Sequence, residues 1–317
     1  MIEFTVSRND AGQRADKFLV KACPGVPRNL LYKAFRKKDI KRNGKRCTPE
    51  EMLCEGDVLR AYLPEDACRM KPQRTVSTQL PLPEIVYEDE NICLMHKPVG
   101  VPVHADDKGT VDTMIGRFTA FLYHRGLYDP LAEQSFVPAL CNRLDRNTEG
   151  LCIGAKNAAA LRCVNEMIRN GEVRKEYLCA VVGKPPKPAD TVVAYHCKKD
   201  GNRVILRYQP FAGAKLAKTG YELLATVGEI SLVRVRLYTG RTHQIRAQMA
   251  LLGCPILGDG AYGDKGANQR YGERFQLLTA YRLTFCPTAA DSVVSNLRGR
   301  CFEITPDFVG KYFPGEY

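Results

Sequence analysis

The sequence lacks an apolar run long enough to cross a bilayer, and its first residues show neither the basic start nor the apolar core of a secretory signal. We therefore expect a protein without membrane association that stays in the cytoplasm. Its hydrophobic content of 44% and mean hydropathy of -0.28 are typical of a soluble chain that folds around a core. A length of 317 residues is enough for two domains.

Cysteine pairs with the two-residue gap of a zinc knuckle or a redox motif are also absent. The 13 cysteines are an odd number in a chain without an export signal, which favours reduced thiols. His96 and His104 are close in sequence, but no third ligand with a fitting spacing follows them. We expect neither disulfides nor a metal site.

Positive charge is what the chain has in excess. The net charge is +12, and residues 1–63 carry 14 Lys or Arg against 8 Asp or Glu. The densest stretch, residues 28–46, has nine basic residues and one acidic residue. Such uneven charge suits a polyanion, and nucleic acid is the partner that we expect. A lysine-rich helix face exposed to water is the alternative.

The N-terminal part of the chain predicts a small domain of its own. Apolar residues three and four apart indicate helices at 14–22 and 28–37, and Asn43-Gly44 is a strong hairpin signal. Residues 64–83 contain four prolines among charged and small polar residues, which is typical of a linker. The predicted organisation is therefore a domain at 1–63, a linker at 64–83 and a second domain at 84–317.

This order of elements resembles the alpha-L RNA-binding module that is shared with a small-subunit ribosomal protein. The matching segments are Arg14–Leu19, the basic second helix, Asn43–Lys45 and Glu55–Val58. The resemblance implies RNA held through its phosphates, with little reading of base sequence. The residues expected to make these contacts are Lys37, Lys38, Lys41 and Arg42.

The second domain predicts strands and helices that interleave without a regular beta-alpha-beta cycle. Apolar stripes indicate a helix at 111–123 and another that Asn157 caps and Gly171 ends. We expect an α+β fold built on a mixed, largely antiparallel sheet. Among its predicted strands are residues 85–87, 92–95, 176–182, 221–226 and 230–237.

Two clusters of polar residues stand out in this domain. The first, Cys141–Leu151, sets Asp145 between Arg143 and Arg146 in a turn that leads into a buried strand. Nearby positive charge favours the ionised form of a carboxylate, which could then act as a nucleophile or a general base. The alternative is an aspartate that caps a turn beside two solvent-exposed arginines.

The second cluster, Tyr238–Arg246, lies where a strand breaks at Gly240 and a helix begins near Thr242. Thr242 as a helix cap and Arg241 as a surface residue would explain each of these residues alone. That interpretation explains less well why Arg, His, Gln and Arg gather within six positions.

Taken in this order, the two clusters resemble the signatures of the RluA-type pseudouridine synthases. The first is similar to His-Arg-Leu-Asp-x-x-Thr-Ser-Gly-Leu and the second to Arg-Thr-His-Gln-Ile-Arg. Lys97-Pro98-x-Gly100, Tyr177 and the segment Pro255–Gly263 match further parts of the family pattern. With the basic module in front, the resemblance covers nearly the whole chain. The departures are Asn142 for a usual His, Glu149 for a usual Ser and Gln248 for a common His, and they weaken any transfer of substrate choice.

The resemblance implies an enzyme that detaches uracil from its ribose in RNA, rotates it and rejoins it through carbon 5, without a metal or an organic cofactor. It makes Asp145 the catalytic carboxylate, Arg241 its paired arginine and Tyr177 the aromatic residue that stacks on the target base. Ile245 would line the base pocket, and Arg143 would fill the gap left by the extruded base. Whether Asp145 attacks the ribose, attacks the uracil or abstracts a proton stays open. Two further residues of the shared motifs are expected to contact the substrate, Lys97 and His243.

Large-subunit ribosomal RNA is the expected substrate of a monomeric enzyme, by analogy with the basic module, and transfer RNA is the alternative. A non-catalytic RNA-binding or ribosome-assembly protein on the same fold is the competing function. A hydrolase that uses the same carboxylate is a third function. It would need a second carboxylate beside Asp145, for which Asp259 and Glu149 are candidates that also suit turns.

Overall fold

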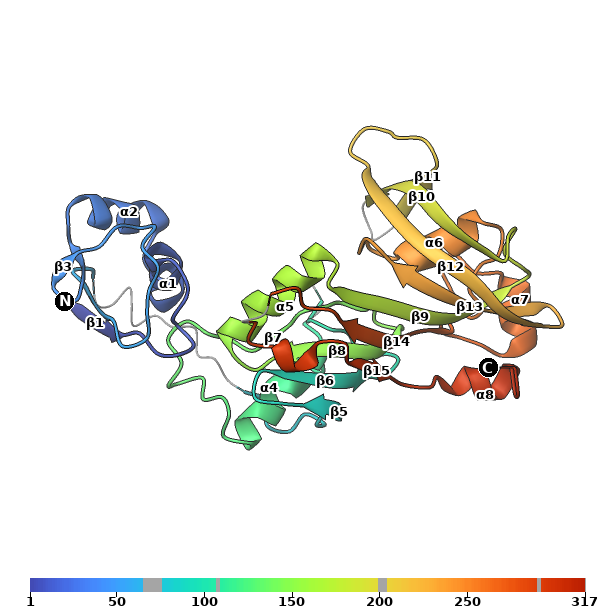
Figure 1. The fold of residues 1–317 in the computed structure, drawn as a ribbon, viewed down its shortest axis with the longest axis horizontal. Helices are drawn as coiled ribbons and strands as arrows, with labels where there is room; N and C mark the ends of the chain where they lie inside the picture. The colour runs from blue at the N-terminus through green and yellow to red at the C-terminus, as the bar shows by residue number, and fades with distance from the viewer. Residues whose placement is uncertain (65–75, 107–108, 199–203, 290–291, 317) are drawn as a thin grey trace.

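The computed structural model describes residues 1–64, 76–106, 109–198, 204–289 and 292–316. A small N-terminal unit, blue in Figure 1, stands at one end of a larger body built on a long twisted sheet. The apolar core of the small unit is made by buried residues between Val6 and Leu63 and shares no member with the cores of the larger body. Most of the predicted linker, residues 65–75, lies outside the described ranges.

Two helices and a four-stranded antiparallel sheet make up the small unit. The predicted helices are confirmed, and residues of their apolar stripes such as Phe18 and Leu31 are buried. Asn43 and Gly44 turn the hairpin with φ angles of 49° and 78°, the left-handed conformation that this residue pair favours. The elements are β1 (Ile2–Thr5), α1 (Ala15–Ala22), α2 (Arg28–Arg36), β2 (Ile40–Arg42), β3 (Lys45–Arg46) and β4 (Val58–Ala61).

The larger body has one sheet of 11 strands. Its strands are β5 (Glu84–Glu88), β6 (Ile92–Lys97), β7 (Ala139–Leu140), β8 (Glu149–Ala155), β9 (Val173–Val182), β10 (Ala189–Lys198), β11 (Val204–Arg207), β12 (Lys215–Val227), β13 (Ile230–Leu237), β14 (Leu278–Phe285) and β15 (Cys301–Glu303). Within the described ranges, β8 and β14 pair in parallel and the other strand pairs of this sheet are antiparallel. The predicted α+β fold with a mixed, largely antiparallel sheet is confirmed.

The helices of the larger body pack on this sheet. The helix predicted at 111–123 begins after Thr113, because the Thr113 side chain accepts the N–H of Gly116 (3.0 Å) and so caps the helix there. Asn157 caps the next helix and Gly171 ends it with a φ of 76°, as predicted. The helices are α4 (Met114–His124), α5 (Ala158–Asn170), α6 (Gln244–Leu251), α7 (Lys265–Tyr271) and α8 (Asp307–Tyr312), with a 3-10 turn η2 (Ser295–Leu297).

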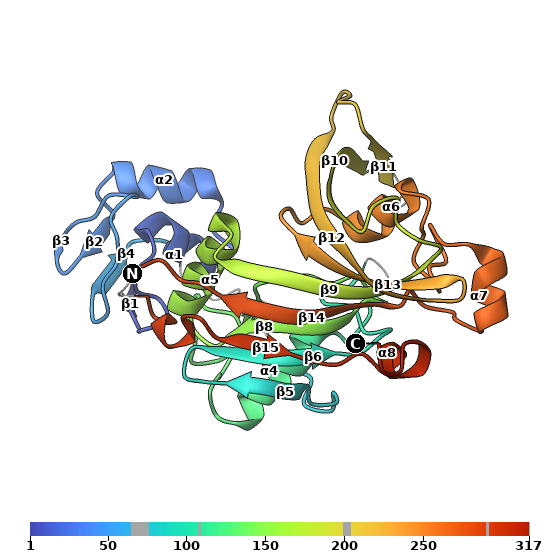
Figure 2. The same cartoon turned by 45° about the vertical axis from the view of Figure 1, so that its right-hand side comes forward.

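Polar side chains join the small unit to the body. Asp10 is fully buried and its Oδ1 accepts both the N–H (3.2 Å) and the hydroxyl (2.5 Å) of Ser135. Gln13 Nε2 also donates to Ser135 Oγ (2.8 Å), and Arg162 on α5 donates to the carbonyl of Ala11 (2.9 Å). Figure 2 shows the small unit beside α5, the helix that carries Arg162. They fix the direction in which the small unit presents its surface.

None of the helices in these ranges combines the length and the apolar character needed to span a membrane. The cysteines of the same ranges are free thiols, and Cys68 lies outside them. Burial raises the pKa of the Cys93 and Cys152 thiols to about 12, so these side chains pack as neutral groups.

Candidate active site

The loop that carries Asp145, residues 141–148, is fastened to the strand that follows it. Asn142 is buried, and its Nδ2 donates to the carbonyl of Leu151 (3.0 Å). Its Oδ1 accepts the N–H of Ile153 (2.8 Å), so the amide satisfies both kinds of backbone group on β8. Asn142, where the family pattern has His, therefore braces the loop.

Lys97 fastens the same loop from β6. Its Nζ donates to three backbone carbonyls, those of Arg146 (2.8 Å), Val101 (2.7 Å) and Pro98 (2.9 Å). The residue is completely buried, and this burial lowers its pKa to about 8. The prediction that Lys97 contacts the substrate is wrong, because its donors are used inside the protein.

Glu149 closes the loop at the start of β8. Its Oε1 lies 2.9 Å from His96 Nε2, and its Oε2 accepts the hydroxyl of Thr279 (3.1 Å). The other ring nitrogen of His96 lies 3.0 Å from a carboxylate oxygen of Glu84. The hydrogen bond with Glu149 raises the pKa of His96, and the same bond lowers the pKa of Glu149. These contacts tie together four strands, β5, β6, β8 and β14, beside the Asp145 loop.

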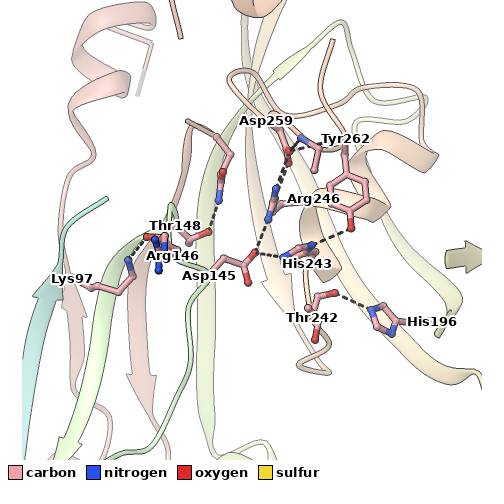
Figure 3. A network of polar contacts seen from close by, with 12 residues as sticks. Lys97, Asp145, Arg146, Thr148, His196, Thr242, His243, Arg246, Asp259 and Tyr262 are labelled. Atoms are coloured by element: carbon pink, nitrogen blue, oxygen red, sulfur yellow. Dashed lines mark hydrogen bonds and ion pairs between the residues drawn. The ribbon is translucent and has the colours of Figure 1, made fainter. Parts of the chain in front are cut away.

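Asp145 meets a guanidinium group from α6 (Figure 3). Arg246 Nη1 lies 3.1 Å from Asp145 Oδ2, while its Nε and Nη2 donate to the two oxygens of Asp259 at 2.7 and 2.9 Å. Asp259 is 1% exposed and also accepts the N–H groups of Ala261 (2.8 Å) and Tyr262 (3.1 Å). Burial disfavours the charge of Arg246, but its bonds to both carboxylates overcome this and raise its pKa. One arginine therefore orients Asp145 and neutralises a buried carboxylate.

The predicted ion pair between Asp145 and Arg241 is wrong. Arg241 lies in the turn before α6, and its Nε donates to the carbonyl of Leu216 (3.1 Å). The helix begins at Gln244, which places Arg246 in its first turn with an exposed fraction of 8%. Arg246 therefore faces the Asp145 loop, and Arg241 stays at the rim of the same cavity.

His243 stands next to the carboxylate in a strained backbone conformation. Its φ of 51° is in the left-handed region, which is uncommon for a residue other than glycine and often marks a functional site. Its Nδ1 lies 3.0 Å from the hydroxyl of Tyr262, and its Nε2 lies 3.9 Å from Asp145 Oδ2. Burial lowers the pKa of His243, so the ring is mainly neutral near pH 7.

Asp145 lies in the wall of a cavity of about 430 Å³. Tyr177 and Ile245, which are 5% and 4% exposed, give this wall an apolar character, and Arg143 and His243 complete it. Burial raises the pKa of the Tyr177 hydroxyl well above its usual value, so that this group stays protonated. Among the described residues that line the cavity, Asp145 is the only carboxylate. Such a wall can receive a planar ring and offers a single group for nucleophilic or base chemistry.

The basic residues of the small unit fall into two groups. Lys37 and Lys38 follow α2 and are exposed, and Lys41 is half-buried on β2. Arg42 is different, because its Nε lies 2.7 Å from Asp57, whose side chain is 7% exposed. Part of the Arg42 guanidinium group therefore compensates a buried carboxylate, and its contact with phosphate stays a prediction.

Two residues of the site were not assigned from the sequence. Arg246 belongs to the second motif, but only Arg241 was given a role there. Asp259 was considered only as a turn residue or a second carboxylate. The available signal was the position of Arg246 next to the apolar Ile245. An arginine that is buried in a helix needs a carboxylate partner, and the Pro255–Gly263 segment supplies one.

The sequence model of the family described as RNA pseudouridylate synthase matches residues 91–251. The ribosomal large subunit pseudouridine synthase C of Salmonella typhi is 33% identical over 276 residues, which cover 84% of this chain and 82% of that protein. The protein of the same name from Escherichia coli K12 is 32% identical with the same coverage.

Solved structures show the same fold. Human RNA pseudouridylate synthase domain containing 4 matches with a TM-score of 0.55 and 24% identity over 71% of this chain and 89% of the human chain. Human RNA pseudouridylate synthase domain containing 1 matches with a TM-score of 0.53 and 22% identity over 75% of this chain and 86% of the human chain. The family match spans more than half of this chain, and the bacterial relatives align with most of it. The chain therefore belongs to the RNA pseudouridylate synthase family and is an RNA pseudouridine synthase.

Proposed function

We propose that this enzyme isomerises uridines in large-subunit ribosomal RNA and that Asp145 is its catalytic carboxylate. The observation that carries the assignment is the contact of Asp145 with Arg246 in the wall of a cavity that Tyr177 also lines. The choice of RNA is supported by the bacterial relatives, which are named as synthases of the ribosomal large subunit.

A uridine in structured RNA has to leave its stack to reach the cavity, which costs a few kcal/mol. The ring of Tyr177 can return about 1–3 kcal/mol by stacking on the extruded base. Ile245 would add an apolar contact next to it, and Arg143, an exposed residue that also lines the cavity, would occupy the gap in the RNA. The volume of about 430 Å³ lies within the usual range of small-molecule sites and suits a single nucleotide.

The reaction breaks the bond from N1 to C1′ and forms a bond from C5 to C1′, and the proton on C5 is replaced by one on N1. Asp145, held by Arg246, is placed to attack the substrate or to take a proton. A glycosidase would need a second carboxylate in the cavity. Glu149 is bound to His96 and Asp259 to Arg246, and neither lines the cavity. The geometry thus favours isomerisation over hydrolysis.

The N-terminal unit is the second part of the proposal. We assign residues 1–63 to an alpha-L RNA-binding domain and residues 84–317 to the catalytic domain. Lys37, Lys38 and Lys41 would bind phosphates, which supply most of the sequence-independent affinity for RNA. The buried contact of Asp10 with Ser135 would keep this basic surface in a fixed orientation toward the active site.

Purified enzyme is expected to form pseudouridine at discrete positions of unmodified large-subunit ribosomal RNA. Nucleosides from digested RNA are separated by chromatography, and the modified positions are mapped after chemical labelling. Transfer RNA and small-subunit RNA serve as parallel substrates. If pseudouridine formed only in transfer RNA, the proposed substrate would be wrong and transfer RNA would replace it. If no cellular RNA were modified, the competing function of a non-catalytic RNA-binding protein would be favoured.

Replacing Lys37, Lys38 and Lys41 with glutamine is expected to weaken RNA binding without changing kcat at saturating RNA. The slope of log affinity against log salt should decrease by about 0.7–0.9 for each phosphate that the protein no longer neutralises. Binding is measured by filter retention at several salt concentrations. An unchanged slope would argue against the small unit as the RNA anchor. The matched control removes three exposed lysines of the body, Lys184, Lys265 and Lys311.

A further inference from the structure

Tyr238 is an exposed aromatic residue at the end of β13. Its exposed fraction is 48%, although its ring lies against the backbone of β12. The contact is possible because Gly220 has no side chain: a Cβ there would lie 3.3 Å from Tyr238 Cε2. The ring is therefore supported by the sheet and still open to solvent.

Two cations lie next to this ring. Lys218 Nζ and Arg236 Cζ are each 5.0 Å from the centroid of Tyr238. Lys218 is exposed and Arg236 is half-buried, and in the described part of the chain neither forms an ion pair with a carboxylate. A solvent-exposed aromatic ring with two cations beside it is a combination that can bind single-stranded nucleic acid.

Tyr238 also lies between two hollows of the surface. It lines the catalytic cavity, and it lines a groove of about 910 Å³ that contains Arg174, Glu176 and Arg236. Successive residues of a strand point to opposite faces, so Glu176 faces the groove while Tyr177 faces the catalytic cavity. The groove is lined by four arginines and four carboxylates, and the carboxylates pair with Lys187, Arg234 and Arg282. Arg174 and Arg236 are the groove cations that, in the described part of the chain, remain for the phosphates of an RNA strand that leaves the cavity over Tyr238.

We propose that Tyr238 is a stacking platform for the base of a nucleotide next to the extruded uridine, with Lys218 and Arg236 bound to the phosphates beside it. The proposal rests on RNA as the substrate of the proposed function and adds a second subsite to it. When the uridine leaves its stack, its neighbour loses a stacking partner. The Tyr238 ring replaces that partner, and stacking tolerates any base, so the subsite favours unpaired neighbours of any sequence.

Tyr238→Ala in the full-length enzyme is expected to raise KM for large-subunit RNA by about tenfold or more, with kcat within about twofold of the wild type. Tyr238→Phe keeps the ring and should bind like the wild type, whereas Tyr238→Leu should behave like the alanine variant. Tyr123→Ala on α4 is the control, because Tyr123 is 43% exposed and lies outside both hollows. A change in kcat with an unchanged KM would overturn the proposal.

A second measurement does not depend on turnover. A short oligouridylate with a single 2-aminopurine at successive positions reports stacking through loss of its fluorescence on binding. We expect quenching by the wild type and by Tyr238→Phe, and none by Tyr238→Ala. Equal affinity and equal quenching of the wild type and the alanine variant would overturn the platform. If instead the proposed function were wrong, the wild-type enzyme would form no pseudouridine, although it would still bind RNA more tightly than Tyr238→Ala.

Discussion

Asp145→Asn is expected to lower the rate of pseudouridine formation at saturating RNA by about four orders of magnitude or more. Asparagine keeps the size of the side chain and one oxygen to which Arg246 can donate, but it cannot act as a nucleophile or accept a proton. Arg246 keeps its two hydrogen bonds to Asp259, so the fold should be retained. The measurement is a single-turnover assay, with RNA affinity determined on the same preparation and expected to stay nearly unchanged.

The matched control for this variant is Asp106→Asn. Asp106 forms an ion pair with Arg146 (2.6 Å), one residue after Asp145, and both side chains are partly exposed. An exposed pair of this kind contributes about 0–1 kcal/mol, so the control should keep nearly full activity. An active Asp145→Asn enzyme would contradict the assignment, and so would one that loses RNA binding and activity in parallel.

Features set by neighbouring residues could be predicted from the sequence. The Asn43-Gly44 hairpin and the helix from Asn157 to Gly171 are local, because their turns and caps are decided within a few positions. The loop of Asp145 belongs to the same class, since its residues fold back on the strand that follows them. Its exact anchors did not follow from the pattern, because Asn142 and Glu149 depart from the family motif.

The partner of Asp145 was predicted in the right segment but at the wrong residue, because no local pattern links two residues that are 101 positions apart. The choice between Arg241 and Arg246 depends on the residue at which α6 begins. Helix boundaries are the least certain part of a sequence-based prediction, and a shift of one turn changes which arginine faces the loop. The motif therefore identified the segment and not the residue.

Charged residues that are bound inside the protein were the second source of error in the predicted site. Lysine and arginine are almost never fully buried without a partner, so exposed contacts with RNA were the natural expectation for Lys97 and Arg42. Lys97 is buried because three carbonyls converge on it, whereas Arg42 is half-buried and paired with the buried Asp57. Convergence of this kind is a property of the fold and leaves no periodic pattern in the sequence.

Arg246→Met is expected to reduce both stability and activity, whereas Arg241→Ala should leave stability unchanged. Asp259 would be left buried without a cation, and breaking a buried ion pair in this way costs about 3–5 kcal/mol. Asp145 would lose the group that orients it, which we expect to lower kcat by about 10²–10³-fold. Arg241→Ala removes one hydrogen bond to Leu216 and should change activity by about tenfold or less.

The double variant Arg246→Met with Asp259→Asn separates the two effects of that arginine. Neutralising Asp259 removes the uncompensated charge, so thermal unfolding should return most of the way to that of the wild type. Activity should stay low, because Asp145 still has no guanidinium group beside it. If the double variant regained both wild-type stability and wild-type activity, Arg246 would affect activity only by stabilising the fold. A larger loss of activity in Arg241→Ala than in the stable double variant would mean that Arg241 replaces Arg246 beside Asp145 once RNA is bound.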